Sequence, residues 1–193
     1  MKLFIKVVLP AAFAAAVFAG SAEAAPRFVG VDGCKCHKQE ITDWERSKHA
    51  KTFELLEAGK KETKKKRAGL DDKDYTKEAR CVKCHTTGYR ESGGFEDLAS
   101  TPKMAGVGCE MCHGAGSEYR NLHKEKTTKF TRDEARAAGQ RFGSVDPSVC
   151  GSCHGHKDNP FKPEVDDSYK FDLQEALKDS RAFHKLYPLE GKH

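Results

Sequence analysis

The pattern of apolar and polar positions predicts helices and loops, without the strict alternation that is typical of strands. Apolar residues recur at helical spacing in residues 40–58, and Gly59 marks the expected end of that helix. A second, shorter helix is expected over residues 74–85. Thr131 begins a capping-box sequence for a third helix, which should stop at Gly139. The pattern therefore indicates a mainly α fold with long loops.

The second half of the chain carries further helix signals. Residues 88–106 contain adjacent glycines and a proline and are expected to be loop. Asp146 is expected to cap a helix before Cys150, with Pro147 as the first helical residue. Asp172 can cap a last helix, and the apolar spacing after it places His184 on the inward face.

The first two dozen residues have the pattern of an export signal. Lys2 and Lys6 precede an apolar run, and Ala22-Glu23-Ala24 resembles a cleavage site. The run of about 14 apolar residues is shorter than the ~20 that span a bilayer. We expect a signal peptide over residues 1–24, a single domain over residues 25–193, no integral membrane span after cleavage, and a periplasmic or extracellular protein.

The cysteines indicate the chemistry. All eight follow the signal segment, in four close pairs, and each pair is followed at once by histidine. Disulfides do not need that histidine, whereas haem attachment does: two thiols add to the two vinyl groups of one porphyrin, and the adjacent histidine binds the iron. Three pairs have the complete spacing: the second motif (Cys81, Cys84, His85), the third (Cys109, Cys112, His113) and the fourth (Cys150, Cys153, His154).

The first motif is irregular, because Cys34-Lys35-Cys36-His37 has one residue between its cysteines. Both thiols could bond through a strained loop. Alternatively only Cys36 bonds, and Gly33 stands where the first cysteine would be. A remnant without haem is a third reading. We favour a haem here that is attached at least through Cys36, which gives four haem c groups in all.

The remaining histidines supply candidates for the second axial ligand. His49, His123 and His184 lie well away from any motif, whereas His156 is two residues from His154 and His193 ends the chain. Methionine is scarce, so ligation by two histidines is expected. Three candidates for four irons leave one iron with an open position.

Composition agrees with this interpretation. Few large apolar residues remain after the signal segment, so haem would supply much of the buried apolar area. The formal net charge of the whole chain is +5. Haem propionates would offset it, so nucleic acid is not an expected partner.

The sequence resembles the tetrahaem cytochrome c-554 family of ammonia-oxidising bacteria. The similarity extends from Val29 to Gly191 and includes stretches outside the bare motifs as well as in them, namely residues 44–51, 73–76, 106–116, 163–166 and 189–191. The resemblance implies a compact multihaem cytochrome fold wrapped around four c-type haems.

The resemblance also implies a ligand map. It pairs His37 with His123, His113 with His49, and His154 with His184, and it leaves His85 without a protein partner. With this map the first and third haems lie side by side. It further suggests that Phe161 walls the open face of the haem at His85.

Three functions remain open at this point. The first is electron transfer between redox partner proteins. The second is an enzyme that reduces a small nitrogen oxide, such as nitric oxide, at an open iron on His85. The third is a subunit of a haem filament. The basic run Lys60–Arg67 is expected to be a solvated face, although it could also dock an acidic redox partner.

Overall fold

The computed structural model describes residues 25–122, 124, 129–141, 146–179 and 183–185. The predicted signal peptide and His123 lie outside these ranges. Within them the chain forms helices and long loops, and its only strand-like pairing is an isolated antiparallel bridge between Thr86 and Ala105. The expected mainly α fold is therefore confirmed. No helix in the described ranges is long and apolar enough to cross a bilayer.

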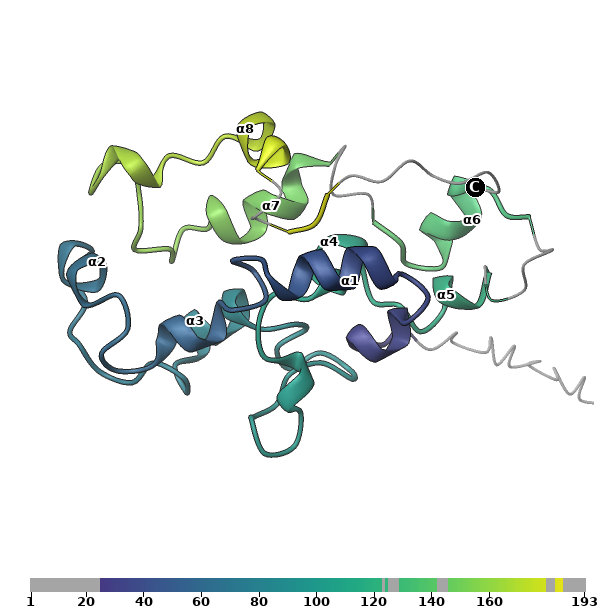
Figure 1. Ribbon diagram of the computed structural model, residues 1–193, viewed down its shortest axis with the longest axis horizontal. Helices are drawn as coiled ribbons and strands as arrows, with labels where there is room; N and C mark the ends of the chain where they lie inside the picture. Colours follow the sequence, from purple (N-terminus) through teal and green to yellow (C-terminus); the bar gives the residue numbers. More distant parts are fainter. Residues whose placement is uncertain (1–24, 123, 125–128, 142–145, 180–182, 186–193) are drawn as a thin grey trace, which may run out of the picture.

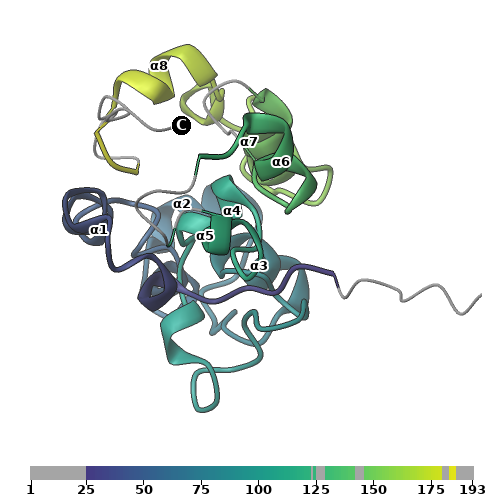
Figure 2. The ribbon, with the colours of Figure 1, turned by 90° about the vertical axis from the view of Figure 1, so that its right-hand side faces the viewer.

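The helices of the described residues are short and are joined by long loops. Figure 1 shows α1 and α4 in the middle, α3 below them, and α7 and α8 above them; Figure 2 shows α7 and α8 on the same upper side. The α-helices are α1 (Lys38–Glu45), α2 (Glu62–Arg67), α3 (Ala79–His85), α4 (Cys109–His113), α5 (Tyr119–Leu122), α6 (Arg132–Ala137), α7 (Pro147–His154) and α8 (Leu173–Lys178). Short 3-10 helices are η1 (Val31–Cys34), η2 (Phe53–Leu56), η3 (Pro102–Met104) and η4 (Asp167–Tyr169).

The main apolar cluster lies between η2, α3 and the loop after α3. The rings of Phe53 and Phe95 are 5.3 Å apart within it. Such a small cluster agrees with the expectation that the polypeptide alone supplies little apolar core. The buried members of the cluster are Phe53, Leu56, Tyr75, Val82, Phe95 and Met104.

The first two predicted helices are shorter in the structure. α1 ends at Glu45, and a turn leads to η2. Here the backbone oxygen of His49 accepts a hydrogen bond from Val107 N at 2.9 Å, so it serves a long-range contact instead of a further helical turn. α3 begins only at Ala79, because the Asp74 side chain accepts from Thr76 N at 2.7 Å and holds a turn before it.

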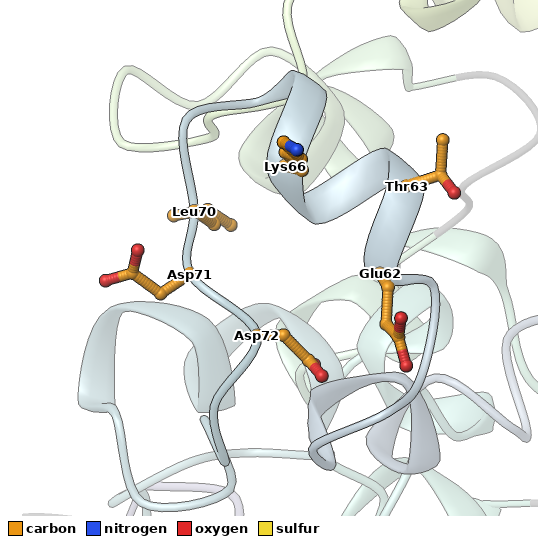
Figure 3. Close-up of a pocket in the computed structure, with 6 residues that line it drawn as sticks. All are labelled: Glu62, Thr63, Lys66, Leu70, Asp71 and Asp72. Atoms are coloured by element: carbon orange, nitrogen blue, oxygen red, sulfur yellow. The ribbon is translucent and has the colours of Figure 1, made fainter.

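The basic run Lys60–Arg67 is exposed, as expected of a solvated face, except at Lys65. It forms α2, in which Lys65 is buried and donates from Nζ to Glu57 O at 2.5 Å. Arg67 forms an ion pair with Asp166, so α2 is attached to the loop after α7. Figure 3 shows the hollow of about 520 Å³ beside α2, which is lined by Glu62, Thr63, Lys66, Leu70, Asp71 and Asp72.

Two of the predicted helix starts are confirmed. Thr131 and Glu134 form a reciprocal capping box at α6, and Gly139 follows its end with φ 93°. Asp146 accepts from Ser148 N at the start of α7, where Pro147 is the first helical residue. These signals are local, so the sequence was sufficient to place them.

The last helix begins as predicted but does not carry His184. Asp172 caps α8, which ends at Lys178. Asp179 contacts the turn after α1, where Lys48 Nζ is 3.2 Å from its Oδ2, and Lys185 N donates to Asp43 Oδ2 of α1 at 3.2 Å. Because α8 ends at Lys178, the expectation that His184 shares its helical face is wrong.

Candidate haem sites

Each complete motif lies in a helix. The second motif ends α3, the third forms α4, and the fourth ends α7. Cysteines three residues apart share one face of a helix, so the two thiols of each motif point the same way. All eight cysteines belong to the described residues, and none forms a disulfide.

The second motif holds its histidine in one protonation form. His85 Nδ1 lies 2.7 Å from the backbone oxygen of Thr52. A carbonyl oxygen only accepts, so Nδ1 carries the hydrogen and Nε2 keeps its lone pair. Burial holds the pKa of His85 below its ordinary value, although the bond to Thr52 opposes this. The imidazole is therefore neutral and can bind a metal.

The third motif is anchored by a buried carboxylate. Glu110 is 2% exposed and accepts hydrogen bonds from three backbone N–H groups: Val29 at 2.9 Å, Gly30 at 2.7 Å and Gly116 at 2.7 Å. These bonds connect α4 to the segment before η1 and to the loop that follows α4. Burial lowers the pKa of His113, and the nearby His184 and His37 lower it further.

The fourth motif holds its histidine between an aromatic ring and a second imidazole. The His154 ring stacks on Phe171 with centroids 4.3 Å apart. Asn159 Nδ2 donates to the backbone oxygen of His154 at 3.2 Å, which fixes the turn after α7. Burial lowers the pKa of His154, and His49 adds to this effect.

The first motif lies in a turn between η1 and α1. His37 N donates to Cys34 O at 2.9 Å, and His37 is the N-cap residue of α1. Cys36 is exposed, while Cys34 is half-buried. A Cβ at Gly33 would lie 2.4 Å from Val29 Cγ2, so a cysteine at the regular position would not fit this backbone.

Two pairs of imidazoles have the spacing of axial ligands. His113 and His184 have ring centroids 6.3 Å apart, and His49 and His154 have centroids 6.1 Å apart. Two imidazoles on opposite sides of one metal ion have centroids about 6 Å apart, since each metal–nitrogen bond is about 2 Å. With the reduced cysteine pairs, this arrangement fits covalently attached haem.

The ligand map that the resemblance implied joined His113 to His49 and His154 to His184. In the structure the His113 ring lies beside His184, and the His154 ring lies beside His49. The pairing of these four histidines on haem irons stays a prediction.

The other ligand predictions have different outcomes. The predicted pair of His37 and His123 stays a prediction, because His123 lies outside the described residues. His85 Nδ1 is engaged by the backbone oxygen of Thr52, and the open position on an iron at His85 stays a prediction. Phe161 packs edge-on against Tyr169, with centroids 5.3 Å apart, and its role as a wall at His85 stays a prediction.

Cysteines of different motifs influence one another. The Cys109 thiol raises the pKa of Cys34, so the first and third motifs are neighbours. The Cys153 thiol raises the pKa of Cys84 in the same way, so the second and fourth motifs are neighbours. α4 contacts α7, which joins the third and fourth. The spatial order is first, third, fourth, second.

Two supporting residues were missed in the sequence. Glu110 looks like an ordinary acidic residue inside a motif, and no local signal marks it as buried. Thr52 acts through its backbone oxygen, which any residue would offer. Both depend on long-range contacts.

Helices that present paired cysteines, with histidines spaced for one metal ion, define the class of multihaem c-type cytochromes. Such a protein carries electrons on covalently bound haem c and exchanges them with redox partners. The chain belongs to the cytochrome c554 family. Residues 33–114 match the family described as "Cytochrome c554 and c-prime".

Known relatives support this assignment. The chain is 36% identical to cytochrome c-554 of Nitrosomonas europaea over 212 aligned positions, which cover 99% of this chain and 89% of that protein. It also matches the structure of the reduced state of cytochrome c554 from the same organism. That match has a TM-score of 0.78 at 36% identity and covers 88% of this chain and 90% of the other.

Proposed function

We propose that this chain is an exported tetrahaem electron carrier with three bis-histidine irons and one open iron. The proposed attachment residues are the three complete cysteine pairs and Cys36, with Cys34 next to it. The axial pairs are His37 with His123, His113 with His184, and His154 with His49, while His85 binds alone. Bound haem supplies one-electron chemistry.

The observation that carries the proposal is the closeness of successive motifs. α4 contacts α7, Cys34 and Cys109 influence each other's pKa, and so do Cys84 and Cys153. This closeness supports four cofactor sites in one continuous row, with the first and second motifs at its ends. A row of this kind suits a protein that accepts electrons at one end and releases them at the other.

Three residues outside the cysteine pairs support this role, because their hydrogen bonds fix the positions of the motifs. Thr52 and Glu110 anchor the second and third motifs through hydrogen bonds, and Asn159 fixes the turn after the fourth. Export fits the same proposal, because covalent haem attachment and the signal pattern of residues 1–24 both point to the periplasm.

Intact mass and coulometry test the proposal together. The holoprotein should have the mass of a chain that begins at Ala25 plus four haems, and reductive coulometry should deliver four electrons per molecule. A mass with three haems and an uptake of three electrons would show that the irregular first motif is empty. No covalent haem at all would reject the function.

A second candidate function rests on His85. The family resemblance leaves His85 without a second protein ligand, while the bond from its Nδ1 to Thr52 O leaves Nε2 able to bind iron, so this iron would have room for a small ligand such as nitric oxide. Anaerobic assays with nitric oxide and a reductant separate the two functions. An electron carrier binds the gas without consuming it, whereas an enzyme consumes it catalytically and gives a reduced nitrogen product.

A further inference from the structure

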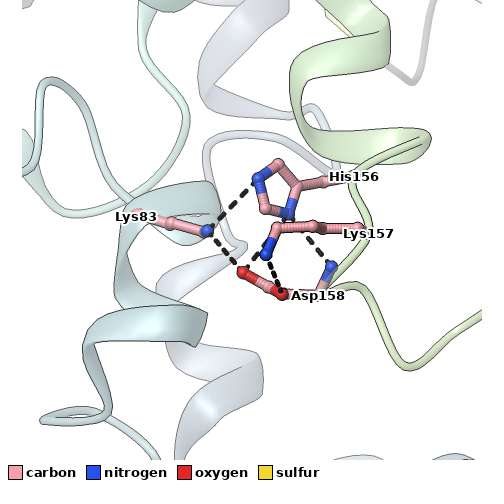
Figure 4. A network of polar contacts seen from close by, with 4 residues as sticks. All are labelled: Lys83, His156, Lys157 and Asp158. Atoms are coloured by element: carbon pink, nitrogen blue, oxygen red, sulfur yellow. Dashed lines mark hydrogen bonds and ion pairs between the residues drawn. The ribbon is translucent and has the colours of Figure 1, made fainter.

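A polar network joins the second motif to the turn after the fourth (Figure 4). Lys83 stands between the two cysteines of the second motif, and its Nζ lies 3.1 Å from Asp158 Oδ2 and 3.4 Å from His156 Nε2. Asp158 N donates to His156 Nδ1 at 3.1 Å. His156 and Asp158 both follow His154 closely in the chain. The network therefore lies where the second and fourth sites meet.

The two charges of the network are held by different sites. The Lys83 side chain leaves α3 between Cys81 and Cys84, so its ammonium group approaches Asp158 from the side of the second site. Asp158 is fixed to the fourth site, because Asn159 Nδ2 donates to His154 O at 3.2 Å and His156 N donates to Cys153 O at 3.3 Å. The pair is thus oriented, with its cation on the second site and its anion on the fourth.

Solvent exposure weakens the electrostatic field of the Lys83–Asp158 pair but does not remove it. The side chains of Lys83 and Asp158 are 35% and 40% exposed, so solvent screens them only in part. Lys157 also approaches Asp158, at 3.7 Å, but it is 87% exposed and more strongly screened. Lys83 is therefore the main partner of Asp158.

We infer that the Lys83–Asp158 pair tunes the two sites in opposite directions, so that an electron moves favourably from the fourth site to the second. A nearby cation stabilises the reduced, less positive iron, whereas a nearby carboxylate stabilises the oxidised iron. Lys83 raises the reduction potential of the second site, and Asp158 lowers that of the fourth. In this step the fourth site gives up one electron and becomes oxidised. The second site accepts that electron and becomes reduced. No proton is transferred. The inference rests on the proposed function.

Redox titrations of the holoprotein at one fixed alkaline pH test this inference. Electron paramagnetic resonance measures the oxidation state of each iron during the titration. The high-spin signal reports the second site, and the low-spin signals report the others. Lys83→Gln should lower the potential of the high-spin iron more than that of any low-spin iron. Asp158→Asn should raise one low-spin potential more than the high-spin potential. The double variant should narrow the gap between the two sites.

Matched variants separate charge from folding. Lys83→Arg keeps the charge and should keep the potentials. Lys178→Gln with Glu175→Gln removes an exposed pair on α8, 2.7 Å apart in the native protein, and should shift no potential. Melting temperatures should change by no more than a few degrees, because exposed ion pairs contribute little to stability.

The outcomes are distinct. Equal shifts in one direction for Lys83→Gln and Asp158→Asn, or unshifted potentials in variants with normal spectra, would overturn the inference alone. Absence of haem, or of any high-spin signal in the native protein, would instead reject the proposed function.

Discussion

Replacing His49 by alanine is expected to convert the iron bound by His154 from low spin to high spin. The His49 and His154 rings are 6.1 Å apart, the spacing of two imidazoles on one metal ion. Without His49 that iron loses one strong-field ligand, so the oxidised protein should show a second high-spin iron per molecule. Electron paramagnetic resonance with spin quantification measures this change. Free imidazole in the buffer should restore the low-spin state, which confirms an intact fold.

A variant that lacks the fourth haem identifies the iron that His49 binds. In a variant with Cys150→Ala and Cys153→Ala, which removes the fourth haem, His49→Ala should add no further high-spin signal. If His49 instead bound the iron at His113, as the resemblance implied, the added signal would persist in that background. His184→Ala is the matched variant, and it should convert the iron at His113.

Replacing Glu110 by alanine is expected to destabilise the protein by about 3 kcal/mol or more, since each buried donor left unsatisfied costs about 1–3 kcal/mol. The carboxylate is 2% exposed and satisfies the N–H groups of Val29, Gly30 and Gly116. Alanine would leave these buried donors without an acceptor. Since folded domains are stable by only about 5–15 kcal/mol, this loss is large. Urea denaturation of the holoprotein measures it.

Two variants control for this effect. Glu110→Gln keeps one acceptor oxygen but places an amide NH₂ against a donor, so it should cost less than alanine. Glu96→Ala removes an exposed carboxylate from the loop after α3 and should change the free energy of unfolding by about 0.5 kcal/mol or less. Equal stability of the Glu110→Ala and Glu96→Ala proteins would contradict the assigned role.

The parts of the site that could be predicted are those set by neighbouring residues. Covalent attachment requires two thiols and a histidine within five positions, so the complete motifs are visible in the sequence. Helix caps such as Thr131 and Asp146 are equally local, and the structure confirms them. Where the chemistry is local, spacing is sufficient.

The features that could not be predicted from the sequence depend on contacts between distant segments. His49 and His184 were recognised as candidate ligands, but the sequence does not say which motif each one meets. That choice depends on where the chain runs after α8, and Asp179 and Lys185 there contact Lys48 and Asp43. The helix expected over residues 40–58 stops for the same reason, since the backbone of His49 bonds to Val107. Glu110 was missed because its three donors come from other parts of the chain.

Quantitative electron paramagnetic resonance of the oxidised holoprotein, combined with a haemochrome assay, tests the central claim most directly. The claim is four haems in one row, three with two histidines and one bound by His85 alone. The account predicts four haems per chain, with three low-spin irons and one high-spin iron. Four low-spin irons, or fewer than four haems, would contradict it.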